Sequence, residues 1–399
     1  MYVLALDISN GRSYCVLYHN QTCLFGDWIL HNQTGFSKLL SVIRGCESVP
    51  EIVFEATGVY SRVMESFCRH QQLPYCLLNP LEARKQTDSL RVNKTDKSDA
   101  HKIAQSHYIH QRAKTQRSPS NYQQLRELSR WYQAIDHQMK FARNQLHLYL
   151  VQSFPEHETY FSTLFSEYAL KIITQFPHPQ RVQSLSRTQL KNILRKQTGK
   201  HASDARALKK AEELIQLAHH SYPAVTADSV ESQLVTHWAN VLLELVQLKK
   251  EVQSRLIEQA QELKEFNVYV SYPGIGELSA ALLIAELGDI TRFKTAKQLN
   301  AYVGIDIQRY QSGNSGTYDR ISKRGNTAAR KLLYIIITNM IRTQRSAPNH
   351  LVNYYYRAKE KPHAKKHKVV MIGCIDRFLK SIHYLTHHGK LYDYKLSPQ

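Results

Sequence analysis

The sequence lacks the cysteine spacing of a disulfide framework or a structural zinc site. None of its six cysteines forms a C-x-x-C pair, and most lie in apolar, strand-like or helix-like surroundings. A long hydrophobic run is also missing: the longest, residues 332–341, is interrupted by Thr338 and Asn339 and is too short to span a bilayer. Residues 1–6 lack the basic stretch of a signal peptide. These absences predict a cytosolic protein with reduced, buried cysteines.

Acidic residues are few compared with basic ones. The chain contains 53 lysines and arginines against 33 aspartates and glutamates, which gives a net charge of +20. An excess of this size, spread along the chain, favours a polyanionic partner over an ordinary basic enzyme. Binding to a membrane surface would need a basic amphipathic anchor, and no such segment stands apart from the globular pattern. With 399 residues, the chain is long enough for two or three domains.

Residues 1–115 have the order of elements of a ribonuclease-H-like α/β domain. Three strand patterns come first, and helices and strands then alternate. Thr34 is the expected N-cap of the first helix, and the fourth strand runs directly into Glu55. The expected strands are residues 2–8, 13–19, 23–30, 51–54 and 73–78, and the second helix covers about 61–70.

Four acidic residues of this domain are candidates for a metal site. Asp7 ends the first strand and Glu55 ends the fourth; these strands would be neighbours, so their carboxylates converge. Asp96 and Asp99 stand three residues apart, which puts both on one face of a helix. Four converging carboxylates repel one another unless divalent cations bind between them, so we predict a Mg²⁺ site, with Mn²⁺ able to substitute. A centre with two ions about 3.5–4 Å apart would act on phosphodiesters. For each acid alone, a helix cap or a solvated ion pair is the alternative.

The segments around these acids resemble those of one known family. Asp7 stands in Leu-Asp-Ile-Ser, Glu55 in Phe-Glu-Ala-Thr-Gly-Val-Tyr, and the other two acids in Lys-Thr-Asp-Lys-Ser-Asp-Ala. They are similar to the DEDD tetrad of a family of bacterial insertion-sequence transposases that also contains the Piv-type DNA invertases. The resemblance implies a RuvC-like domain in which Asp7, Glu55, Asp96 and Asp99 hold the metal.

Residues 116–268 contain two long helical patterns. Apolar residues recur every three or four positions over residues 125–150 and again over 234–263. We expect an antiparallel coiled coil, because an insertion at about 155–230 separates the two stretches; two helices of a globular bundle are the alternative. Basic segments of the insertion favour phosphate contacts or a solvated surface equally. The resemblance implies a coiled-coil region that helps protomers associate, and therefore a dimer or tetramer.

Residues 269–399 are expected to form a mainly α-helical domain. The Pro-Gly-Ile-Gly segment, with Gly274 and Gly276, precedes an apolar helix and is typical of a helix-hairpin-helix turn, whose backbone N–H groups contact a phosphate. An ordinary turn is the alternative for this motif alone. A loop rich in glycine and serine follows, and the cations Arg320, Lys323 and Arg324 come directly after it. A serine hydroxyl beside cations could attack phosphorus, although a serine in an ordinary turn is the simpler interpretation of this loop alone.

The resemblance extends to this domain and gives the serine a role. Pro-Gly-x-Gly, Ala-Tyr-x-Gly, Gln-Ser-Gly and Ile-Ser-Lys-Arg-Gly-Asn occur here in the order of the family's transposase domain. The serine of Ser-Gly is the nucleophile of the family and corresponds to Ser312. The family often has Gly-Leu-x-Pro where this chain has Gly-Ile-Asp-Ile at residues 304–307. Ser315, also followed by glycine, therefore remains a second candidate.

Together these features predict a DNA transposase or recombinase of a bacterial insertion sequence. It would cleave and rejoin DNA with Mg²⁺ through a covalent phosphoserine intermediate. The resemblance further implies a bridge RNA, encoded by the element, that pairs with donor and target DNA. We expect DNA, this RNA and further copies of the chain as partners, no membrane, and a cytoplasmic, nucleoid-associated location.

Because the acids and Ser312 lie far apart in the sequence, we expect an active site completed across domains or protomers. Two other interpretations remain. One is a Holliday-junction-type nuclease or resolvase that uses metal-activated water, and the other is a non-catalytic RNA-binding scaffold.

Overall fold

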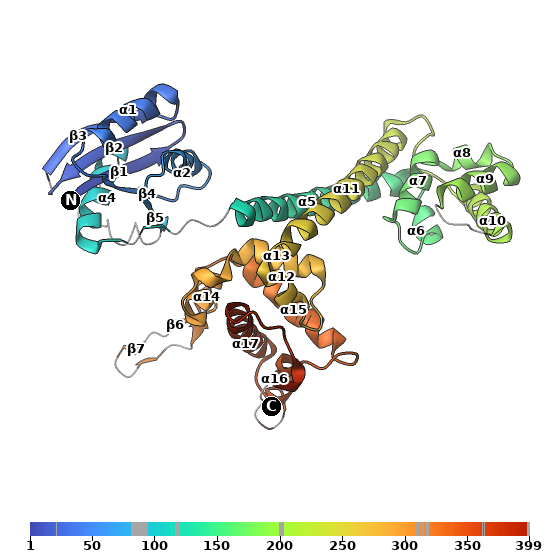
Figure 1. The fold of residues 1–399 in the computed structure, drawn as a ribbon. Coiled ribbons are helices and arrows are strands. Elements are labelled where there is room, and N and C mark those ends of the chain that lie inside the picture. The colour runs from blue at the N-terminus through green and yellow to red at the C-terminus, as the bar shows by residue number, and fades with distance from the viewer. Residues whose placement is uncertain are drawn as a thin grey trace. The chain divides into compact units, whose positions relative to one another are not determined.

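The chain folds into two compact units, Met1–Arg117 and Ser118–Gln399 (Figure 1). The computed structural model describes residues 1–20, 22–80, 95–112, 114–115, 120–198, 203–308, 311–312, 315–316, 319–360, 362 and 364–396, with the backbone alone for 311–312 and 315–316. Lys94 of the acidic motif and Gly313 and Asn314 of the glycine- and serine-rich segment lie outside these residues.

The first unit is a mixed five-stranded sheet in the order β3-β2-β1-β4-β5. The first three strands form an antiparallel meander, and β4 and β5 continue the sheet in parallel with β1. The strands are β1 (Tyr2–Ser9), β2 (Arg12–His19), β3 (Thr22–Leu30), β4 (Glu51–Glu55) and β5 (Tyr75–Leu78), and the helices are α1 (Gln33–Arg44), α2 (Ser61–His70) and α4 (Asp96–His110).

Alternation along β1 sends its side chains into two separate cores, because successive residues of a strand point to opposite faces. Leu4 and Leu6 pack with residues of α1 and α2 on one face of the sheet. Val3 and Ala5 pack with α4 on the other face. The sheet is therefore covered on both sides, and α4 is the helix on the face that Asp7 shares with Val3 and Ala5.

The cap expected at Thr34 is wrong. Helix α1 is capped by Asn32, whose side-chain oxygen accepts a hydrogen bond from the Gly35 nitrogen at 2.8 Å. Asparagine is at least as good an N-cap as threonine, so residue type alone does not show which of Asn32 and Thr34 caps the helix. The helix begins at Gln33, two residues earlier than a cap at Thr34 allows.

The second unit is built on two long helices, α5 (Ser120–Ser153) and α11 (Val230–Gln261), which lie side by side (Figure 1). Side-chain pairs along their length run in opposite order on the two helices: Trp131 with Arg255, Asp136 with Lys249, and Phe141 with Trp238. The two helices are therefore antiparallel, as expected. That they supercoil as a coiled coil stays a prediction.

The insertion between them is helical. The backbone nitrogen of Ala224 donates a hydrogen bond to the Gln152 carbonyl at 2.9 Å and so joins its two ends. Its elements are α6 (His157–Tyr160), α7 (Glu167–Gln175), α8 (Pro179–Gln183), α9 (Arg187–Gln197) and α10 (Asp204–His220).

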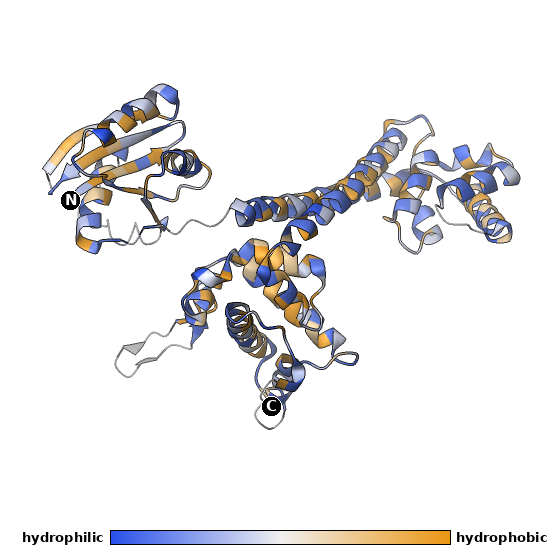
Figure 2. Cartoon of the chain, in the orientation of Figure 1, coloured by the Kyte–Doolittle hydropathy of each residue, from blue (hydrophilic) through white to orange (hydrophobic). Residues whose placement is uncertain are grey.

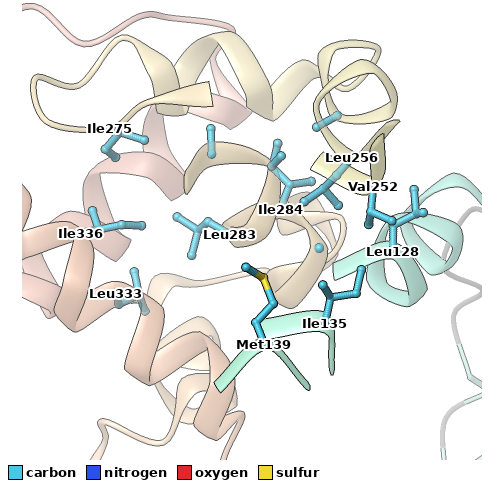
Figure 3. Close-up of a cluster of buried hydrophobic side chains, with 14 of the residues drawn as sticks. Leu128, Ile135, Met139, Val252, Leu256, Ile275, Leu283, Ile284, Leu333 and Ile336 are labelled. Atoms are coloured by element: carbon cyan, nitrogen blue, oxygen red, sulfur yellow. The ribbon is translucent and has the colours of Figure 1, made fainter. Parts of the chain in front are cut away.

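The remaining elements are mostly helices that share one core with α5 and α11. They are α12 (Lys264–Val270), α13 (Glu277–Leu287), η1 (Ile290–Arg292), α14 (Ala296–Val303), β6 (Ile307–Gln308), β7 (Gln311–Ser312), β8 (Ser315–Gly316), β9 (Arg320–Ile321), α15 (Thr327–Thr343), α16 (His350–Arg357), α17 (His367–His387) and η2 (Tyr394–Leu396). Figure 3 shows side chains of α5, α11, α13 and α15 meeting in this core. Helix α13 is apolar over most of its length (Figure 2). The core thus continues across the expected domain boundary at residues 268–269.

A mixed α/β first unit followed by a mostly helical chain confirms the predicted fold class at this level. In the described ranges, none of the helices is long and apolar enough to cross a membrane.

Candidate active site

Asp7 and Glu55 lie next to each other at one end of the first sheet. Strands β1 and β4 are parallel neighbours, and their paired residues run up to Leu6 opposite Phe54. Asp7 and Glu55 each follow that last pair and are half-buried. Because Asp7 is two residues beyond Ala5, and Glu55 two beyond Val53, both acids share the face on which α4 packs.

The first turn of α4 carries the other two acids. Thr95 caps the helix: its hydroxyl accepts a hydrogen bond from the Ser98 nitrogen at 3.1 Å, and the Ser98 hydroxyl accepts one from the Thr95 nitrogen at 3.1 Å. Asp96 and Asp99 follow this cap, where the helix dipole favours negative charge. A carboxylate oxygen of Asp99 lies 3.5 Å from the Lys102 ammonium nitrogen.

Contacts at its two ends show that α4 runs opposite to β1 and β4. Near its start, the Lys97 ammonium lies 6.0 Å from the centre of the Tyr14 ring, and Tyr14 pairs with Asp7 in the sheet. Near its end, Nε2 of His107 lies 2.6 Å from a carboxylate oxygen of Glu51, the first residue of β4. The turn with Asp96 and Asp99 therefore lies at the end of the sheet that carries Asp7 and Glu55. We call these four residues the acid edge.

The four carboxylates are brought to one edge and one face, but they do not form a ready-made ligand cage. Among the described residues, no group of three or more histidines, cysteines, aspartates and glutamates is arranged to hold a metal ion. The donors nevertheless suit one class of metal, because carboxylate oxygens are the ligands of Mg²⁺ and Mn²⁺ rather than of softer ions.

Ser312 lies in a short β-hairpin of the second unit. At its base, β6 pairs with β9 through Ile307 opposite Ile321 and Gln308 opposite Arg320. Nearer the tip, β7 pairs with β8, and Ser312 stands directly opposite Ser315. The backbone pairing therefore does not separate the two candidate serines. We call residues 307–321 the serine hairpin.

The three cations expected beside the serine lie at the base of this hairpin and after it. Arg320, Lys323 and Arg324 are all exposed. Lys323 has a positive φ of 56° and donates its backbone N–H to the Gly304 carbonyl at 3.0 Å. The cations therefore lie close in the chain to the point where the hairpin leaves the helical core, whereas Ser312 belongs to the pair of strands farther from it.

Two glycines hold the base of the hairpin against the core. A Cβ on Gly325 would lie 2.4 Å from the backbone nitrogen of Gly304 and 2.4 Å from the Tyr302 carbonyl oxygen. Gly304 also has a φ of 79°, which side-chain-bearing residues rarely adopt. The Ala-Tyr-x-Gly and Arg-Gly-Asn segments thus meet by direct backbone contact.

A buried carboxylate adds a polar tie at the same place. Glu286, at 1% exposure, accepts hydrogen bonds at 2.9 Å from Arg130 of α5 and from the Asn326 side chain. The Arg126 guanidinium donates to the Glu286 carbonyl at 3.0 Å and to the Tyr302 hydroxyl oxygen at 2.6 Å. We call this set, Arg126, Arg130, Glu286, Tyr302 and Asn326, the hairpin anchor.

The electrostatics of the anchor are dominated by its arginines. Burial, the largest single effect, would raise the pKa of the Tyr302 hydroxyl, but the charges of Arg126 and Arg292 and hydrogen bonds with Asn326 and Arg126 together hold this pKa below its ordinary value. The Arg292 guanidinium lies 4.9 Å from the centre of the Tyr302 ring. Sequence analysis missed Glu286 and Arg126 as anchor residues. The signal was an acid near the end of an otherwise apolar helix, because a buried charge has to be paired.

The Pro-Gly-Ile-Gly turn lines a groove of about 430 Å³ together with Asn339, Arg342 and Thr343 of α15. Gly274 has a φ of 92°, and a Cβ there would lie 2.8 Å from the Met340 Cα, so this glycine allows α15 to pack closely. Gly276 caps α13 and has open space where a Cβ would stand. The groove therefore combines the N-terminus of α13 with the cation Arg342, a suitable setting for a phosphate.

Two family models match this chain. One is described as "Transposase", carries the DEDD name of IS110 elements, and matches residues 4–155. The other is described as "Transposase IS116/IS110/IS902 family" and matches residues 268–352. The chain belongs to the IS116/IS110/IS902 family of transposases. The acid edge lies within the first match of this transposase family and the serine hairpin within the second, and the hairpin anchor joins residues of both.

Three curated relatives are also named as transposases. The transposase for insertion sequence element IS1111A of Coxiella burnetii is 43% identical over 63 residues, 16% of this chain and 17% of the relative. The transposase for insertion sequence element IS1328 of Yersinia enterocolitica is 30% identical over 104 residues, which are 26% of this chain and 29% of the relative. A probable family 20 transposase of Pseudomonas aeruginosa is 38% identical over 60 residues, which are 15% of this chain and 18% of the relative. The chain thus matches less than a third of the length of each relative.

Proposed function

We propose that this chain cuts and rejoins DNA as the transposase of an insertion sequence, with Ser312 as the nucleophile. The observation that carries the proposal is the acid edge, where Asp7 and Glu55 end neighbouring parallel strands and the first turn of α4 lies at the same end. Family membership supports DNA as the substrate, and the charge of +20 suits a phosphate-rich partner.

Asp7, Glu55, Asp96 and Asp99 would hold the metal. Mg²⁺ bound there would polarise a phosphodiester and offset its negative charge. The residues of this chain would do the rest. Ser312 would contribute the attacking hydroxyl, and the exposed cations Arg320, Lys323 and Arg324 would bind neighbouring phosphates.

The covalent step is balanced without an energy source. The Ser312 oxygen forms a bond to phosphorus as the bond from phosphorus to one deoxyribose oxygen breaks, and that oxygen takes up the proton of the serine hydroxyl. One DNA end is then joined to the protein and the other ends in a free hydroxyl. Attack by that hydroxyl, or by one from another strand, reverses the step, so rejoining needs no ATP. Water in place of the serine would lose the bond energy by hydrolysis.

The family resemblance supports two partners. A bridge RNA would select the donor and target DNA, and further copies of the chain would assemble with it as a dimer or tetramer. Phosphate contacts with this RNA would draw on the same excess of basic residues.

Protein–DNA adducts test the proposal. Wild-type protein is incubated with end-labelled DNA carrying the element ends, treated with protease and run on a denaturing gel, and the adduct is mapped by mass spectrometry. We expect an adduct at Ser312 that disappears in Ser312→Ala. Ser315 pairs with Ser312 across the hairpin, and we expect Ser315→Ala to form much of the wild-type amount of adduct. An adduct that persists in Ser312→Ala, or hydrolytic cleavage with no adduct in the wild type, contradicts the assignment.

A further inference from the structure

A cluster of aromatic rings lies on the surface where α15, α16 and α17 meet. His367, the first residue of α17, bridges two tyrosines: Nε2 is 3.0 Å from the Tyr334 hydroxyl and Nδ1 is 2.9 Å from the Tyr355 hydroxyl. The His367 ring stands at 86° to the Tyr334 ring and at 83° to the Tyr355 ring. Tyr356 packs edge-to-face on Tyr355, with ring centres 5.3 Å apart. We call these four residues the aromatic cluster.

The cluster is fixed in position yet open to solvent. The histidine ties together rings from three different helices, which limits their rotation. Tyr334 nevertheless remains 38% exposed and Tyr356 47% exposed. Single exposed aromatic residues are common, but several exposed rings grouped on one surface are typical of a binding site.

Cations surround the cluster. The Lys359 ammonium lies 6.0 Å from the centre of the Tyr355 ring. The backbone nitrogen of Lys365 donates to the Ala358 carbonyl at 3.0 Å, so the basic run before α17 folds back onto the end of α16. Five exposed cations stand here, and within the described residues none of them forms an ion pair: Arg357, Lys359, Lys365, Lys366 and Lys368.

We propose that the aromatic cluster binds unpaired nucleotides of a nucleic-acid strand, with its rings stacking on bases and the surrounding cations contacting phosphates. Stacking on aromatic rings together with a cationic track is how proteins hold single strands of any sequence. An acidic peptide would use the cations but would gain little from exposed tyrosine faces. Most of the cluster lies beyond residue 352, outside both family-matched segments. The inference rests on the proposed function, in that the chain acts on nucleic acid.

The test measures binding of full-length protein to labelled oligonucleotides of one sequence as single-stranded DNA, single-stranded RNA and duplex DNA. Tyr356→Leu is the main variant, because Tyr356 is the most exposed of the cluster's tyrosines and its loss should leave the fold intact. We expect it to weaken binding to a single strand about tenfold, ~1.4 kcal/mol, and to leave duplex binding unchanged. Tyr334→Phe, which keeps the ring, should bind as the wild type does.

The matched control is Tyr384→Leu. Tyr384 is a tyrosine of similar exposure, 52%, near the other end of α17, and its loss should have no effect. The paired change Lys365→Gln with Lys366→Gln should instead lower the slope of log K against log salt, by about 0.7 for each phosphate that these lysines neutralise in the wild type. A larger effect of Tyr356→Leu on RNA identifies RNA as the strand, and a larger effect on DNA identifies DNA.

If Tyr356→Leu binds single-stranded DNA and single-stranded RNA as tightly as the wild type does, this proposal is wrong. If Ser312 still forms its adduct in that case, the proposed function stands and only the aromatic cluster loses its role. If the wild-type protein binds none of the three oligonucleotides, both proposals fall.

Discussion

Gly325 crosses Gly304 so closely that a Cβ on Gly325 would come within 2.4 Å of the Gly304 backbone nitrogen. This contact, together with the hairpin anchor, fixes where the serine hairpin leaves the core. The hairpin is thus held at its base, and substitutions at the base should change the position of Ser312 although they make no contact with it.

Gly325→Ala tests this relationship. The added methyl group meets backbone atoms that cannot move aside, so we expect a loss of stability of about 1–3 kcal/mol and a weaker Ser312–DNA adduct. Denaturant unfolding and the adduct gel measure the two effects. Gly45→Ala is the control, because its φ of −74° suits any residue and a Cβ there would make only ordinary contacts of 3.5 Å. Equal stability of Gly325→Ala and wild type would show that the crossing is not rigid.

The acid edge predicts stabilisation by metal. A cation that binds only the native state increases the free energy of unfolding, by ~2.7 kcal/mol when the free cation concentration is a hundred times Kd, and so raises the melting temperature. We expect millimolar Mg²⁺ or Mn²⁺ to raise the melting temperature of the wild type and to raise that of Asp7→Asn less. Glu51→Gln is the matched control: Glu51 lies on the same strand as Glu55 but at its opposite end, beside His107. An identical metal-dependent shift in Asp7→Asn counts against Asp7 as a ligand.

The groove at the start of α13 predicts a change in salt dependence. If Arg342 contacts one phosphate, Arg342→Gln should lower the slope of log K against log salt for duplex DNA by about 0.9. Fluorescence anisotropy over a series of salt concentrations measures this slope. Arg187→Gln is the control, because Arg187 is already paired with Glu212 at 2.6 Å. Unchanged slopes in both variants would remove the phosphate site from this groove.

A buried histidine predicts loss of stability in acid. Burial lowers the pKa of His157 in α6 from 6.5 to about 4, against a smaller opposing effect of its 2.8 Å hydrogen bond to the Phe176 carbonyl. Its folded-state pKa is depressed, so its contribution to stability is complete above pH 6.5 and is lost as the pH falls toward 4. The full loss is about 3 kcal/mol.

Unfolding measured at several pH values in His157→Gln should lack this part of the acid destabilisation. His220→Gln, at an exposed histidine of the same insertion, should keep it. A wild-type pH profile in His157→Gln would mean that burial of the imidazole does not control acid stability here.

Much of the first unit could be predicted because its signals are local. An alternating, β-rich segment marked β1, a second strand-like segment marked β2, and the apolar run that ends at Glu55 marked β4. The antiparallel pairing of α5 with α11 followed from apolar spacing and an intervening insertion. The N-cap of α1 was predicted at the wrong residue, because Asn32 and Thr34 stand close together and both residue types can cap a helix.

Long-range contacts could not be predicted in this way. Spacing put Asp96 and Asp99 on one helix face, but the direction in which α4 crosses the sheet depends on distant partners such as Tyr14 and Glu51. The hairpin anchor joins Arg126 to Tyr302, which are far apart in the chain, and no local pattern reports such a pair. Sequence proximity likewise suggested that Arg320 stands beside Ser312, whereas the hairpin puts Arg320 at its base.

Hydrophobic residues that never meet a substrate decide which way Glu55 faces. Ile52 and Phe54 are buried on the side of α1 and α2, so β4 cannot slide by one residue without exchanging its two faces. The buried apolar face of β4 therefore determines which residues of the strand point to each side of the sheet. A residue gained or lost between α1 and β4 leaves that arrangement untouched, whereas a single insertion inside β4 turns Glu55 away from Asp7.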